Sequence, residues 1–358
     1  MSSEVIFFAG FTVFVILVMM LDLGAFNRKS TSHIVSFKEA ASWSAVWVAL
    51  ALGFYVFLRY FGYWVHDISD PSHLEAVRTT YYQNLTLPAD FDAALAKFQS
   101  NMALEYLTGY LVEYSLSVDN IFVFILIFNS FGVREIYYKK VLVWGILGSI
   151  VLRFIFIFVG SALIQEFSWV LYIFGAFLVY TGISILISKD KEDGIDVQKH
   201  PAVRLTSRYF NVFERYVVDH FFVRSKRTRK FYVTPLFVVM IVIAFTDVVF
   251  AVDSIPAIFS ITKDPYIVFF SNVFAIMGLR SMFFFLVNII DMFSYLKYGL
   301  GVLLTFIGAK MLLEHQLHEW GFNNMYSLLI IVGILAISII ASLVFPPKEE
   351  KPVIEVKE

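Results

Sequence analysis

The chain has 358 residues, of which 59% are hydrophobic and only 16% are charged, and its formal net charge is −1. About 25% of the residues of an ordinary soluble domain are charged, so this composition indicates an integral membrane protein. The near-zero net charge gives no support to nucleic-acid binding. The complete absence of cysteine excludes disulfides, thiolate metal sites and thiol redox chemistry.

Nine apolar runs follow one another along the chain, and each is long enough to cross a bilayer as a helix of about 20 residues. The first follows Glu4 instead of a basic segment and is longer than the core of a secretory signal, which indicates a retained helix. The sequence therefore predicts an all-α polytopic membrane protein with about nine transmembrane helices. The expected spans are residues 5–26, 37–58, 102–128, 138–160, 168–187, 231–261, 266–290, 294–313 and 325–345.

Lysine and arginine gather in alternate connections between these runs. Most of them lie in residues 27–38, 131–140 and 189–231, at Lys297 and in the C-terminal tail. Cytoplasmic loops of membrane proteins carry an excess of basic residues. The pattern therefore predicts a multi-pass protein of the cell (inner) membrane, with its N-terminus outside and its C-terminus in the cytoplasm.

Two connections are longer than the others. Residues 61–101 form the expected extracytoplasmic loop, whose acidic residues indicate either a cation-attracting vestibule or simply a solvated cap. The basic cytoplasmic loop of residues 189–231 carries aromatic residues at near-helical spacing between Tyr209 and Phe222. This spacing predicts an amphipathic helix on anionic lipid, although the charges also serve as a topology signal.

Two acidic segments inside apolar runs have the same pattern. Glu113 lies six residues before Asp119, and Asp247 lies six residues before Asp253. A carboxylate at membrane depth costs about 2.5–3.5 kcal/mol on insertion scales, so four of them need compensation. A bound cation would supply it.

The similarity between the two halves extends beyond the acidic segments. Arg153 and Arg280 each stand in a phenylalanine-rich run, and each is followed by two glycines seven residues apart. Three expected helices form each unit, so the second unit enters the membrane from the opposite side, as in the 3+3 inverted-topology repeats of secondary transporters. The predicted organisation is two N-terminal helices in 1–60, the loop 61–101, repeat one in 102–188, the basic loop 189–231, repeat two in 232–314, and a last helix with a charged tail in 315–358.

The candidate metal ligands come from the two acidic segments: Glu113, Asp119, Asn120, Asp247, Asp253 and Ser254. Accessory candidates are Asp22, Ser117, Thr246, Arg153 and Arg280, the two arginines as structural or gating partners. The alternative is that the acids are protonated, or pair with Arg153, Arg280 and Lys310. An all-oxygen set suits hard ions such as Mg²⁺, Ca²⁺ and Mn²⁺. Convergence of these groups requires local unwinding, which Pro256 and the polar neighbours of Asp119 would promote.

At Leu116–Asn120 and at Asp247–Pro256 the chain resembles the TerC family of integral membrane proteins, named for tellurium resistance. The resemblance covers nearly all the spans, including Asp22 to Phe26 near the end of the first. It implies a Mn²⁺ exporter whose ligands are the six residues above. Members of the family are also described as redox modulators, but this sequence has no cysteine to perform such chemistry.

We therefore expect a carrier, not an enzyme, that exports a hard divalent cation such as Mn²⁺ by alternating access, in exchange for protons. An intramembrane hydrolase built on paired aspartates is disfavoured because no nucleophile arrangement is evident. The alternative is a membrane scaffold for tellurium or metal stress resistance, whose 189–231 loop docks stress-resistance proteins or exported metalloenzymes. Apart from the transported or bound Mn²⁺, we expect no cofactor, and the partners are the bilayer, a divalent ion and protons.

Overall fold

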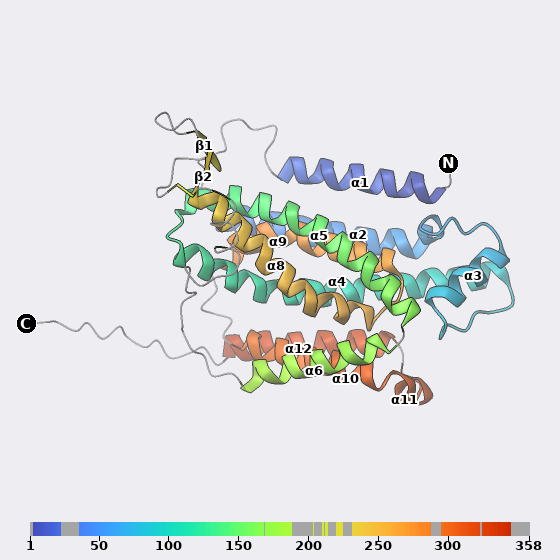
Figure 1. Cartoon of the computed structure of the whole chain (residues 1–358). Helices are drawn as coiled ribbons and strands as arrows, with labels where there is room; N and C mark the ends of the chain where they lie inside the picture. The colour runs from blue at the N-terminus through green and yellow to red at the C-terminus, as the bar shows by residue number, and fades with distance from the viewer. Residues whose placement is uncertain are drawn as a thin grey trace, which may run out of the picture.

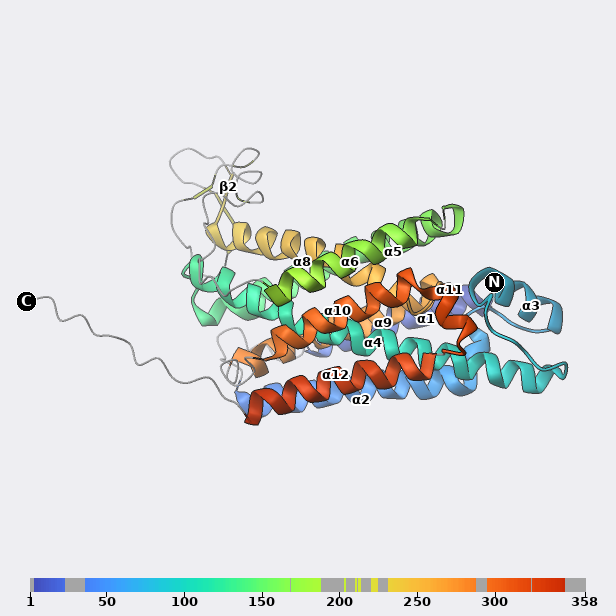
Figure 2. The ribbon, with the colours of Figure 1, turned by 90° about the horizontal axis from the view of Figure 1, so that it is seen from below.

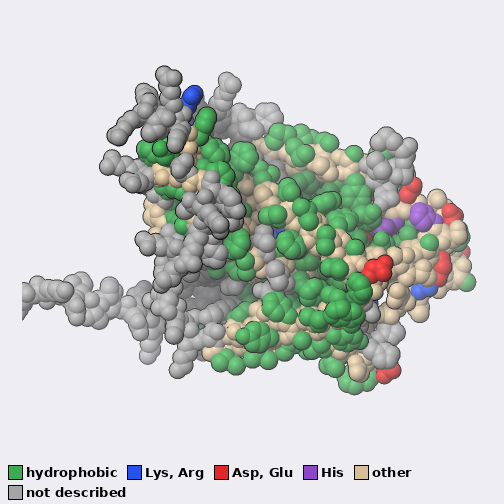
Figure 3. All heavy atoms as spheres, in the orientation of Figure 1, with side chains coloured by type: hydrophobic (Ala, Val, Ile, Leu, Met, Phe, Trp, Pro, Cys, Tyr) green, Lys and Arg blue, Asp and Glu red, His purple; other side chains and the backbone are tan. Residues whose placement is uncertain are grey.

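The protein is a bundle of long α-helices that run alongside one another in the computed structural model (Figure 1). The structure describes residues 3–22, 36–167, 169–187, 203, 210, 212–213, 220–224, 231–287, 295–322 and 324–344. On the face seen in Figure 3, hydrophobic side chains cover much of the described bundle, whereas acidic and histidine side chains gather around the end that carries α3. The expected all-α membrane fold is confirmed.

The described helices follow the expected runs with shifted ends. They are α1 (Ser3–Asp22), α2 (Phe37–Phe61), α3 (Pro71–Tyr81), α4 (Phe91–Ser130), α5 (Tyr138–Glu166), α6 (Val170–Ile187), α8 (Pro235–Phe259), α9 (Pro265–Val287), α10 (Leu296–Leu312), α11 (Glu314–Glu319) and α12 (Asn324–Val344), with 3-10 turns at Gly62–Trp64 and Glu135–Tyr137. In the described part of the chain, six helices are long and apolar enough to cross a membrane, and two shorter apolar helices cover Ile6–Val18 and Tyr298–Leu312. The number of nine spans stays a prediction.

Residues 61–101, expected to be an extracytoplasmic loop, are more ordered than that prediction. They contain α3 and the first turns of α4, a helix of 40 residues. At 1.5 Å per residue this length is about 60 Å, twice the hydrocarbon thickness of a bilayer. Asp70 caps α3 by accepting the His73 N–H at 2.9 Å. The Ser72 hydroxyl and the His73 N–H hold the pKa of Asp70 below its ordinary value, because both stabilise the carboxylate.

The end of the basic loop is extended. Strands β1 (Phe222–Arg224) and β2 (Phe231–Val233) form an antiparallel pair, so the prediction of a helix from residue 231 is wrong. α8 begins at Pro235. Proline suits the first turn of a helix because the N–H that it lacks would have no hydrogen-bond partner within the helix there. The amphipathic helix expected between Tyr209 and Phe222 falls mostly outside the described residues, and Phe222 itself belongs to β1.

α4 and α9 lie at the centre of the bundle. α9 packs on α4, α2 and α5, and α8 packs on α5 and α4; nearly the whole of α9 is buried. In an inverted repeat, α4, α5 and α6 correspond in order to α8, α9 and α10. The α4–α9 contact then corresponds to the α8–α5 contact, and the α6–α10 contact corresponds to itself. These pairings are what an inverted repeat would require, and the repeat itself stays a prediction.

α6 and α10 cross at very short range (Figure 2). A Cβ added to Gly182 would lie 2.6 Å from the Gly301 carbonyl oxygen, and one added to Gly308 would lie 2.6 Å from the Gly175 oxygen. Real Cβ atoms do not approach carbonyls so closely. The paired glycines found in the sequence therefore allow backbone-to-backbone packing of these two helices.

Candidate ion site

Arg153 of α5 is the centre of a buried polar cluster. Its Nε lies 3.1 Å from Asp247 Oδ2 and its Nη2 lies 3.2 Å from Asp247 Oδ1, so the guanidinium donates to both oxygens of a carboxylate on α8. Its Nη1 donates a short bond to Glu113 Oε1 on α4. One guanidinium thus joins the acids that open the two repeated segments.

Two neutral groups complete the cluster. Asn272 Oδ1 on α9 lies 2.6 Å from Arg153 Nη1, and the Ser254 hydroxyl on α8 lies 3.4 Å from the same nitrogen. The side chains of Glu113, Arg153, Asp247, Ser254 and Asn272 are at most 3% exposed. We call these five residues the core cluster; they come from four helices that pack against one another.

Several polar atoms on the cluster helices have no hydrogen-bond partner although they are buried. Those closest in sequence to the core cluster include Glu113 Oε2, Ser117 Oγ, Asn120 Nδ2 and Asn272 Nδ2. A buried polar group left without a partner costs about 1–3 kcal/mol. The bundle interior therefore retains capacity for a polar ligand.

The structure brings some of the predicted site residues together. Glu113, Asp247 and Ser254 meet at Arg153, and Asn120 and Ser117 lie buried on α4 one to two turns from Glu113. The Thr246 hydroxyl instead donates to the Val242 carbonyl at 2.7 Å within its own helix.

The other predicted residues lie away from the core cluster or have side chains outside the described part of the structure. The side chains of Asp22, Asp119 and Asp253 are outside the described residues, although the backbone places Asp119 on α4 and Asp253 on α8. Arg280, on α9 eight residues after Asn272, lines a small cavity with Glu39 and Lys139.

The prediction of local unwinding is wrong. α4 is helical through Asp119 and α8 is helical through Asp253. The Ser115 hydroxyl donates to the Leu111 carbonyl, 2.6 Å away and one turn earlier in the same helix. The helix remains intact around this side-chain hydrogen bond. Pro256 falls in the last turn of α8, where the missing N–H removes a bond close to the end of the helix.

Asn272 was not predicted. Its signal was an amide in the largely apolar run 266–290, but no rule of spacing connects it to residues on α5 and α4. Among residues whose side chains are described, no group of three or more His, Cys, Asp or Glu could hold a metal. The core cluster has two carboxylates and one guanidinium, and therefore a net charge of −1 when its acids are ionised.

Comparison with known proteins gives a consistent family. Residues 98–350 match the family described as the integral membrane protein TerC family. "Uncharacterized membrane protein STKORF319" of Myxococcus xanthus is 41% identical over 339 residues, which cover 94% of this chain and 91% of that protein. "Putative membrane-bound redox modulator Alx" of Escherichia coli (strain K12) is 41% identical over 331 residues, 92% of each chain. No solved structure matches significantly.

Proposed function

Because this chain belongs to the TerC family of integral membrane proteins, we propose that it is a multi-pass transporter that exports a hard divalent cation, preferentially Mn²⁺, by alternating access. The proposed ligands are Glu113, Asp119, Asn120, Asp247, Asp253 and Ser254. The observation that carries this proposal is the core cluster, in which acids from α4 and α8 face one guanidinium inside a bundle of apolar helices.

Arg153 acts in this proposal as an internal counter-ion. A carboxylate pair without a cation would leave uncompensated charge in a medium of low polarity, which is strongly unfavourable. The guanidinium neutralises part of that charge when no cargo is bound. An entering divalent cation would then take its place on Glu113 and Asp247, which changes the net charge at the two carboxylates and their counter-ion from −1 to 0.

The donor types favour a hard cation. Carboxylate, amide and hydroxyl oxygens suit Mn²⁺, Mg²⁺ and Ca²⁺, and the sequence has no cysteine to select softer ions. Carboxylates must lose their protons before they bind a metal. Proton uptake on the outer side would release the cargo, which makes metal export in exchange for protons a natural cycle.

The names of the relatives suggest a redox role for those proteins. In this chain thiol chemistry is excluded, because none of its 358 residues is cysteine. An effect on cellular redox state through metal balance requires no redox group in the protein. Tellurium resistance is explained in the same indirect way, because tellurite is an anion and the acidic cluster has the wrong sign to bind it.

Transport by the purified full-length protein in liposomes tests the proposal. Imposed Mn²⁺ and pH gradients should drive Mn²⁺ movement, and Glu113→Gln and Asp247→Asn should each reduce it at least tenfold. Glu166→Gln is the matched control, because this exposed carboxylate at the end of α5 lies outside the cluster. Wild-type protein that moves no divalent ion under either gradient would refute the proposal.

The scaffold alternative predicts a different outcome. If the protein is a carrier alone, a chain shortened within residues 189–219 should keep both ion transport and metal tolerance. If the shortened chain keeps transport but loses metal tolerance in cells, the loop has a separate docking role.

A further inference from the structure

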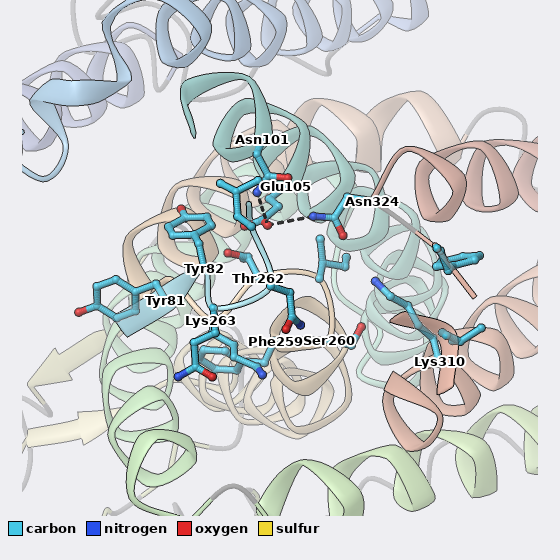
Figure 4. Close-up of a pocket in the computed structure, with 17 residues that line it drawn as sticks. Tyr81, Tyr82, Asn101, Glu105, Phe259, Ser260, Thr262, Lys263, Lys310 and Asn324 are labelled. Atoms are coloured by element: carbon cyan, nitrogen blue, oxygen red, sulfur yellow. Dashed lines mark hydrogen bonds between the residues drawn. The ribbon is translucent and has the colours of Figure 1, made fainter. Parts of the chain in front are cut away.

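A cavity of about 340 Å³ opens at the extracytoplasmic end of the bundle. Its walls come from α4, the α8–α9 turn, α10, α12 and the segment that follows α3 (Figure 4). We call it the outer cavity. Its position is fixed by a buried network: Asp264, in the α8–α9 turn, accepts the Tyr82 hydroxyl at 2.8 Å and contacts His66 Nε2 at 2.7 Å.

Among the described residues that line this cavity, Glu105 of α4 is the one acid. Its Oε1 accepts the Asn101 amide at 2.7 Å and the Asn324 amide at 2.9 Å. Its Oε2 is buried and has no hydrogen-bond partner, and the residue is 6% exposed. Figure 4 shows the two amides converging on the carboxylate from α4 and α12.

The unsatisfied atom indicates which ligands the cavity can bind. A carboxylate oxygen accepts hydrogen bonds or binds cations, so a suitable ligand is a donor or a cation. Lys263 and Lys310 also line the cavity, but both already take part in interactions. The carboxylate, the Thr262 hydroxyl and the carbonyl oxygens of the flanking amides offer an oxygen set that hard cations accept.

The outer cavity lies on the helices that carry the core cluster. Glu105 precedes Glu113 by eight residues on α4, a distance of about 12 Å along the helix axis. α8 carries Asp247 and Ser254, and its last residue, Phe259, lines the cavity. Glu105 is therefore the next acid along α4 from Glu113 toward this end of the bundle.

We propose that the outer cavity is a second binding site for the divalent cation, with Glu105 as its anionic ligand, where cargo pauses before release. This inference rests on the proposed function. The cavity has a single carboxylate, and two lysines, Lys263 and Lys310, also line it; the charge of Lys310 acts on Glu105. The site therefore binds more weakly than the core cluster, as a release site must.

Mn²⁺ binding to detergent-purified full-length protein, followed by electron paramagnetic resonance, tests the second site. A variant with Glu113→Gln and Asp247→Asn, which disables the core cluster, should retain one weak Mn²⁺ site. Adding Glu105→Gln should lower the affinity of that remaining site at least tenfold, whereas adding Glu166→Gln should leave it unchanged. Lys310→Met should instead tighten it several-fold, because a competing positive charge is removed.

The outcomes separate this inference from the proposed function. If the core-disabled variant binds no Mn²⁺, or binds equally with and without Glu105→Gln, the outer site is refuted, whether the cavity holds water or a neutral donor. Transport in liposomes would still stand in that case. If wild-type protein moves no divalent ion but the Glu105-dependent site is present, the export proposal fails and the outer site remains as a binding site. Unfolding temperatures of all variants show that each is folded.

Discussion

The core cluster and the outer cavity use different means to keep a carboxylate inside the bundle. In the core, Glu113 and Asp247 face a guanidinium that is held by four helices. In the outer cavity, Glu105 is held on one oxygen by two neutral amides, and the other oxygen is buried without a hydrogen-bond partner. The first arrangement is closed by an internal cation, whereas the second relies on neutral donors. In the export path proposed above, a strong site in the core followed by a weak site in the outer cavity would suit both loading and release of the cargo.

The largest expected effect comes from Arg153→Met. It leaves two buried carboxylates without their cation, which we expect to reduce the free energy of unfolding by about 3–5 kcal/mol. Thermal unfolding of the purified protein in detergent measures this loss. Arg134→Met, at an exposed position before α5, is the control. Combining Arg153→Met with Glu113→Gln and Asp247→Asn should recover most of the loss, and equal unfolding of the two arginine variants would contradict the prediction.

A smaller effect is expected from Asn272→Leu. The variant removes the acceptor 2.6 Å from Arg153 Nη1, and hydrogen bonds to charged groups contribute about 1.5–3 kcal/mol. The neighbouring variant Ser271→Ala should cost less, since that hydroxyl bonds only to the Val268 carbonyl of its own helix. Chemical unfolding of the two variants in the same detergent compares them. If Ser271→Ala is the more destabilising, Asn272 does not support the guanidinium.

The wall of the outer cavity should be less sensitive. Burial, followed by the charge of Asp264, raises the pKa of Tyr82 well above its ordinary value, so its hydroxyl remains a donor at neutral pH. Tyr82→Phe removes this donor but leaves His66 on Asp264, and we expect a loss of about 1 kcal/mol. The exposed Tyr60→Phe is the control in thermal unfolding. A loss above that of Arg153→Met would reverse the ranking of the two regions.

The smallest effect concerns Asp70, at the cap of α3 beyond the outer cavity. Its pKa is lowered in the folded protein, so its contribution to stability is complete above the ordinary value of 3.8 and is lost as the pH falls through the folded value. Asp70→Ala should therefore speed amide exchange in Pro71–Tyr81 at neutral pH and have little effect below the folded pKa. Amides of α2 serve as the internal reference. Equal exchange in both proteins at neutral pH would show that the cap is not needed.

The sequence by itself determined the fold class. Long apolar runs require helices in a bilayer, because only internal hydrogen bonding satisfies the backbone there. The sequence also identified the acidic segments around Glu113 and Asp247, because a carboxylate within an apolar run is costly enough to stand out. Helix ends were less certain: α4 begins at Phe91 and α8 at Pro235, where local capping and the β2 strand decide.

Only the tertiary structure decided how the polar groups meet. Arg153 joins Glu113 to Asp247, which are 134 residues apart in the sequence, because α5 packs against α8 and close to α4. Glu105 acquires its cavity in the same way, from Asn324 on α12 and the turn at Thr262. Spacing along one helix fixes which residues share a face, but the partner across the interface depends on helix packing. The charged and polar residues inside the bundle can therefore be identified from the sequence, whereas which of them pair with one another depends on how the helices pack.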